Sequence, residues 1–173
     1  MPDRLDKGAL LTRLAALLEG QHGFSRVHPD ATDLFARAAV EALAGLQSYE
    51  LAFAGHLGGL ILVACIFGER VSGAELARRA EALYDRARVL GDRLDGPVTA
   101  LQLALYDRPV TVQERDTVLT QARRVPLFGI GKTRVATWLF ALDEPALHAR
   151  RFPGWPQELS AEELRKLLLS AAL

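Results

Sequence analysis

Apolar residues recur at helical spacing along most of the chain. Leucines between residues 10 and 18 share one face, and Gly20 ends that segment. The same spacing returns from Leu34 to Leu43, just before Gly45. The intervening positions are mostly polar, so each segment has one side to bury and one side for water. The pattern predicts amphipathic helices that pack together.

Three further helix starts are marked by capping boxes, in which a serine or threonine precedes a glutamate by three residues. The hydroxyl and the carboxylate of such a pair satisfy main-chain N–H groups that the first helical turn leaves unpaired. We therefore expect helices to begin after each pair. The pairs are Ser72 with Glu75, Thr111 with Glu114, and Ser160 with Glu163.

An uncharged run from Leu51 to Phe67 approaches the length that spans a bilayer. His56 and several glycines interrupt it, and charged residues flank it, so we interpret it as the central helix of a soluble bundle and expect no membrane partner. Short helices are also predicted from Pro97 to Tyr106 and from Val135 to Leu142. The fold class expected is all-α: residues 1–173 form a single domain, a compact bundle of about eight helices.

The composition supports the prediction of helices and limits the classes of function that the chain could have. Hydrophobic residues make up 50% of the chain and aromatic residues 7%, and leucine and alanine favour helix. The 21 basic and 21 acidic side chains cancel, so any basic surface must be local. The single cysteine, Cys65, cannot form a disulfide within the chain or a cysteine-rich zinc site. With no secretory signal pattern at the amino end, we expect a cytoplasmic protein.

The segment Leu127-Phe128-Gly129-Ile130-Gly131-Lys132 carries the main functional hypothesis. Its glycines allow a tight connection between two helices, and the amino end of the second helix would offer N–H groups to an anion. The sequence predicts a site for a phosphate here. The predicted site residues are Gly129, Ile130, Gly131, Lys132, Thr133 and Arg134, with Arg123 and Arg124 adding positive charge.

Residues 111–142 resemble the helix-hairpin-helix superfamily, on the strength of the glycine pair at 129 and 131 and Lys132. The resemblance implies binding of duplex DNA through hairpin amides, largely independent of base sequence, with a monovalent cation on the hairpin carbonyls and no other cofactor. Arg150, Arg151 and Trp155 would extend the surface.

The all-helical DNA glycosylases of this superfamily resemble residues 138–145. They carry a catalytic aspartate further on, where this chain reads His148-Ala149-Arg150-Arg151-Phe152. The resemblance therefore implies a degenerate relative, and we assign neither catalytic residues nor metal ligands.

Several function classes stay open. The preferred hypothesis is a non-catalytic DNA-binding protein, with DNA repair or maintenance as its setting. The alternatives are a protein-interaction module, such as a homodimer that uses leucine and alanine surfaces, and a glycosylase-like repair enzyme. Gly129 to Thr133 also ends like a Walker phosphate-binding loop, although a buried strand should precede such a loop. His28-Pro29-Asp30 is interpreted as a turn and helix cap.

Overall fold

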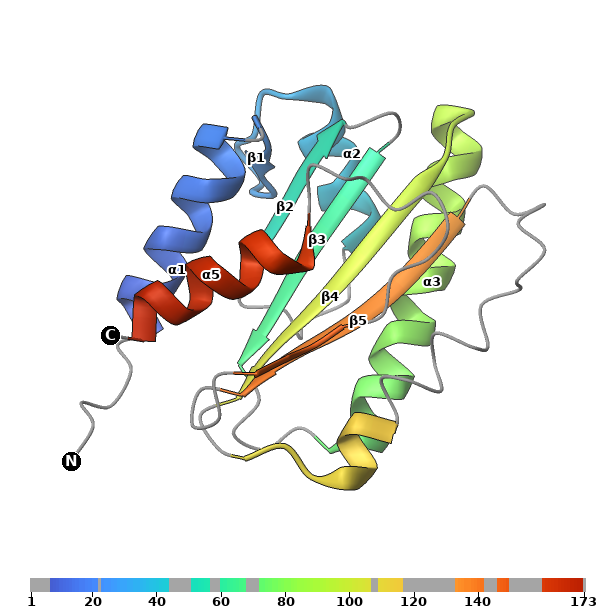
Figure 1. Ribbon diagram of the computed structural model, residues 1–173. Coiled ribbons are helices and arrows are strands. Elements are labelled where there is room, and N and C mark those ends of the chain that lie inside the picture. Colours follow the sequence, from blue (N-terminus) through green and yellow to red (C-terminus); the bar gives the residue numbers. More distant parts are fainter. Residues whose placement is uncertain are drawn as a thin grey trace.

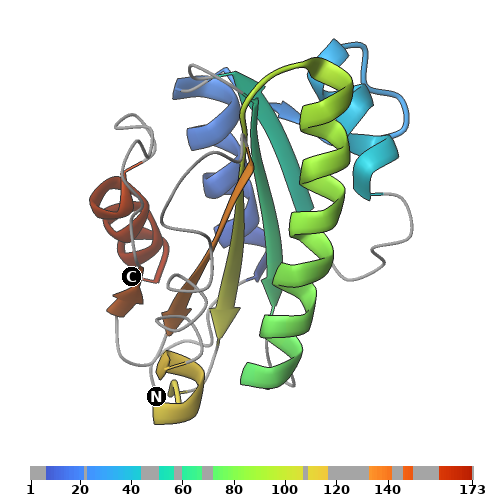
Figure 2. The same cartoon turned by 90° about the vertical axis from the view of Figure 1, so that its right-hand side faces the viewer.

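The protein has three layers, with a mixed β-sheet between two layers of helices (Figure 1). Seen edge-on, the sheet separates the long green helix α3 from the blue α1 and the red α5 (Figure 2). The computed structural model describes residues 7–21, 23–43, 51–56, 60–67, 72–106, 109–116, 133–141, 146–149 and 160–172.

Helices make up the two outer layers. A short helix at residues 112–116 lies at one end of the sheet. The others are α1 (Lys7–Ala15), which continues as the π-helical turn η1 (Ala16–Gln21), α2 (Leu34–Leu43), α3 (Gly73–Leu94) and α5 (Ala161–Ala172).

Six strands form the sheet in the order β1-β2-β3-β4-β5-β6. The first three pair antiparallel, β3, β4 and β5 run parallel, and β6 is antiparallel to β5. Helix α3 connects the parallel neighbours β3 and β4, as a crossover between parallel strands requires. The strands are β1 (Ser25–Arg26), β2 (Leu51–His56), β3 (Leu60–Phe67), β4 (Val98–Tyr106), β5 (Thr133–Ala141) and β6 (Ala146–His148).

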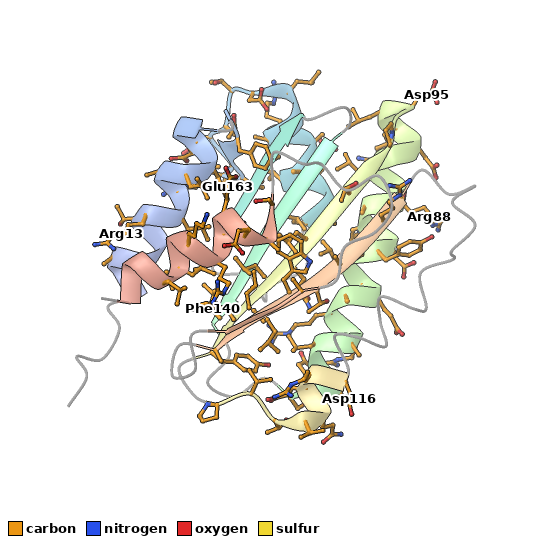
Figure 3. All side chains as sticks on the ribbon, in the orientation of Figure 1. Arg13, Arg88, Asp95, Asp116, Phe140 and Glu163 are labelled. Carbon is orange, nitrogen blue, oxygen red and sulfur yellow. The ribbon has the colours of Figure 1, made fainter. Side chains whose placement is uncertain are left out.

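The central strands β4 and β5 divide the core into two halves. Side chains alternate along each strand, so leucines of β4 and the rings of Trp138 and Phe140 face α1 and α5. Figure 3 shows Phe140 beneath this helical layer. The other face of the same strands packs against α3, through residues such as Ala100, Val135 and Leu139, and α2 joins this layer by packing against α3 and β2. Each half of the core therefore depends on both strands.

The expected all-α bundle is wrong, because the fold is mixed α/β. The uncharged run from Leu51 to Phe67 forms the antiparallel strands β2 and β3 instead of one helix. The predicted helix from Pro97 to Tyr106 is β4, and the one from Val135 to Leu142 falls on β5. Among the described residues, no helix is long and apolar enough to cross a membrane.

Two-sided burial explains this error. Every residue of β4 from Ala100 to Tyr106 is buried, and β5 is buried from Val135 to Ala141. A strand covered on both faces has no polar side, so its sequence loses the alternation that identifies half-buried strands. Such short apolar runs cannot be distinguished from buried helices by periodicity, and leucine and alanine then tip the prediction toward helix.

The three helix starts marked by capping boxes, in contrast, are confirmed at residue level. Main-chain N–H groups of Glu75 and Glu163 donate to the hydroxyls of Ser72 and Ser160, at 3.2 and 3.0 Å. Thr111 and Glu114 form the full reciprocal box and begin the helix at residues 112–116. These caps are local hydrogen bonds, so a change of fold class around them leaves them intact.

Gly55 provides a test of packing in the first half of the core. A Cβ at this position would overlap the ring of Phe24, which is 3% exposed and belongs to the core beneath α1. We expect Gly55→Ala to lower the free energy of unfolding by about 1–3 kcal/mol, because the ring must leave its place. Chemical denaturation followed by circular dichroism measures the change.

Gly20→Ala is the matched control, since nothing lies within 4 Å of a Cβ there. The double variant Gly55→Ala, Phe24→Leu should lose less than the sum of the single losses, because the smaller side chain leaves room for the added methyl group. Unchanged stability of Gly55→Ala would contradict this account of the contact.

Candidate functional site

Most of the predicted phosphate site lies outside the described residues. Arg123, Arg124 and residues 129–132 belong to that undescribed part, as do Arg150, Arg151 and Trp155 of the predicted extension. The structure describes the last two residues of the main site, Thr133 and Arg134, at the beginning of β5. Thr133 is buried and Arg134 is half-buried.

The second helix of the predicted hairpin is replaced by a strand. Of residues 111–142, the structure describes a helix at 112–116 and the strand β5 at 133–141. A strand offers no converging row of free N–H groups at its beginning, whereas a helix does. The prediction that Gly131 opens a helix whose dipole favours an anion is therefore wrong, because residues 133–141 form a strand. For the same reason a Walker loop is excluded here, since that loop leads into a helix.

Helix α3 ends beside the beginning of β5. Asp95 caps it in the left-handed conformation, with φ 47°, and the N–H groups of Asp95 and Gly96 both donate to the Gly91 carbonyl. A Cβ on Gly91 would lie 3.5 Å from the hydroxyl oxygen of Thr133, so the helix and the strand approach closely there. The negative end of the α3 dipole thus faces the amino ends of β4 and β5, and it does not favour a phosphate.

The opposite end of the sheet holds the amino end of α3 and a group of charged side chains. Figure 3 shows Asp95 and Asp116 at these two opposite ends. Arg79 Nε lies 2.7 Å from one carboxylate oxygen of Glu75, and Arg78 Nε lies 3.0 Å from the other. Arg79 and then Arg78 lower the pKa of the Glu75 carboxyl below its ordinary value of 4.5 by donating these hydrogen bonds. Glu75, Arg78 and Arg79 thus form a cluster, the Glu75 cluster, in which the charges of the first turns of α3 are paired.

Close to the carboxyl end of β4, a buried carboxylate closes a second cap. Glu114 is 4% exposed, and one of its oxygens accepts the N–H of Thr111 at 2.9 Å. Val110 beside it packs with Tyr106 and with Leu76 of α3. The short helix therefore begins next to an apolar cluster that includes Leu76 in the first turn of α3.

A buried polar pair was missed by the sequence reasoning. Gln102 of β4 donates to the Leu76 carbonyl of α3 at 3.1 Å and to the Thr137 hydroxyl of β5 at 3.2 Å. Both side chains are almost fully buried. The available signal was a lone glutamine in the apolar run Ala100 to Tyr106, because a buried amide needs hydrogen-bond partners.

The remaining candidates show no assembled chemistry. His28 is exposed, and its Nδ1 accepts the N–H of Asp30, which confirms the predicted turn. The cap of α2 is Asp33, whose carboxylate accepts the N–H of Ala36. His56 and Cys65 lie on β2 and β3. In the part of the chain that the structure describes, no group of three or more His, Cys, Asp or Glu residues could hold a metal ion.

Comparisons with known proteins returned no match, whether to protein-family models, to curated proteins or to solved structures.

The Glu75 cluster predicts a specific pH dependence of stability. Because the pKa of Glu75 is lower in the folded state than in the unfolded chain, its ion pairs stabilise the fold above the unfolded pKa. That contribution is lost as the pH falls through the folded pKa. We expect Glu75→Gln to be less stable than the wild type at neutral pH, with a gap that narrows below pH 4.5.

Urea denaturation at a series of pH values measures that gap. The control is Glu81→Gln, which removes an exposed carboxylate from the same helix. A constant difference between wild type and Glu75→Gln from neutral pH to strongly acidic pH would rule out the arginine contacts as its cause.

Proposed function

We propose that the protein binds the phosphate backbone of duplex DNA, largely without regard to base sequence, and catalyses no reaction. The observation that carries the proposal is a segregation of charge in a chain whose net charge is zero. Every charged side chain between residues 117 and 142 is basic: Arg123, Arg124, Lys132 and Arg134. Such a local cluster is the feature that phosphate contacts require.

The fold changes how such a grip would work. Since β5 follows Lys132, attraction in this proposal comes from basic side chains and from main-chain N–H groups of the glycine segment, without a helix at residues 133–141. Arginine forks match phosphate oxygens well, and this supports a backbone contact that reads no bases. Arg150, Arg151, Trp155 and a monovalent cation on the segment's carbonyls belong to the same proposal as extensions of the surface.

The outer face of α3 provides the contrast. Its arginines are interspersed with acidic residues, and two of them are bound to Glu75. Arg93 in turn pairs with Glu41 of α2, at 2.8 Å. A helix whose charges are balanced in this way attracts a polyanion weakly, so we expect the DNA contact to lie away from it.

The test is a fluorescence-anisotropy titration of a short labelled duplex at several salt concentrations. We expect the wild type to bind duplexes of different sequence alike and to lose affinity steeply as salt rises. Lys132→Glu should weaken binding equally for all sequences, and the salt slope should fall by about 1 because one phosphate contact is lost.

Arg86→Glu is the matched control, because it makes the same charge change at an exposed position of α3. It should bind as the wild type does. Equal losses in the two variants would indicate a general charge effect and would contradict the assignment to the segment before β5. No duplex binding by the wild type at low salt would refute the proposed function itself.

A further inference from the structure

The buried polar pair joins three elements at one point. Gln102 is fully buried, and its amide nitrogen reaches both the main-chain carbonyl of Leu76 and the hydroxyl of Thr137. Gln102 and Thr137 are direct neighbours in the β4–β5 register. The hydrogen bonds of this one side chain therefore depend on how α3, β4 and β5 are aligned with one another.

The apolar residues around the pair exclude a slip of one residue more firmly than a slip of two. A slip of one residue between two strands turns every side chain to the wrong face and is costly. A slip of two residues keeps every apolar side chain on its proper face, because the side-chain period along a strand is two. After such a slip, Gln102 would face Val135 or Leu139 in place of Thr137.

The polar pair makes that slipped register unfavourable. Neither a valine nor a leucine side chain can accept the amide hydrogen of Gln102, so a buried donor would lose its partner. The Leu76 carbonyl adds a constraint on the helix, because a shift of α3 by one turn displaces that oxygen by about 5.4 Å. The network is satisfied in one alignment of the three elements.

We propose that Gln102 and Thr137 are a register lock, which selects one alignment of β4, β5 and α3 among apolar alternatives. The lock determines which alignment is populated, and it contributes less to the free energy of unfolding. Buried polar groups in apolar cores have this role in other systems, where they fix the register of paired elements. This proposed role of Gln102 and Thr137 does not depend on the proposed DNA binding.

The double variant Gln102→Leu, Thr137→Val tests the lock, since it replaces both partners by apolar groups of similar size. We expect its denaturation midpoint to equal or exceed that of the wild type. Its amide NMR spectrum should show extra or broadened resonances for β4 and β5, and their hydrogen exchange should be at least about tenfold faster.

The matched control is Thr133→Val, a change of the same chemistry at a buried threonine that lies on the same face of β5. It should keep one sharp set of resonances and the exchange rates of the wild type. The single variant Thr137→Val keeps the bond from Gln102 to α3, and we expect heterogeneity confined to β5.

Two results would overturn the proposal. One is a single set of sharp resonances with wild-type exchange in the double variant, because the register would then be fixed by packing alone. The other is a double variant that is unfolded, because the pair would then be needed for stability and not for selection among folded alignments.

Discussion

The rest of the structure depends on the burial of β4 and β5 on both faces. Their side chains alternate between two apolar layers, so α1 and α5 share one cluster with these strands on one side, and α3 packs on the same strands on the other, with α2 against α3 and β2. Trp138 and Phe140 fill one layer, and they are among the largest fully buried side chains in the described part of the chain. Truncating a buried side chain of this size costs several kcal/mol, about 3–5 for an aromatic ring.

Because the core is buried in this way, the few polar groups within it determine how the elements around them are aligned. A strand between two apolar layers can carry a glutamine only if its amide finds partners, and Gln102 finds them on both a neighbouring strand and a helix. Apolar contacts are not directional, whereas these hydrogen bonds are satisfied at one position. Packing therefore supplies most of the stability, and the polar pair supplies alignment.

The parallel run gives the two ends of the sheet different chemistry. Helix α3 begins near the carboxyl ends of the parallel strands, where Glu75 gathers two arginines, and it ends beside Thr133, with its carbonyl groups toward the amino ends. A phosphate near Arg134 must therefore be held by basic side chains, because the helix end beside it carries the wrong partial charge. The proposed DNA contact thus depends on the sequence cluster that ends at Arg134.

Of the candidate site, the sequence identified the basic cluster and the glycines, but it could not say which element follows them. Residues 133–141 have apolar positions that suit one side of a helix, and the same residues suit a strand that is covered on both faces. The decision comes from β4, which pairs with β5 along its whole length. The polar pair was equally out of reach, because residues 102 and 137 meet only when the sheet forms.

The sequence by itself determined where three of the described helices begin. The caps at Ser72, Thr111 and Ser160 each join residues that are three positions apart in the sequence. No distant part of the chain is needed to make those hydrogen bonds. Only the tertiary structure decided that the long apolar runs are strands. An apolar run has no preferred partner of its own, and whether it becomes a helix or a strand depends on which surfaces from elsewhere in the chain cover both of its sides.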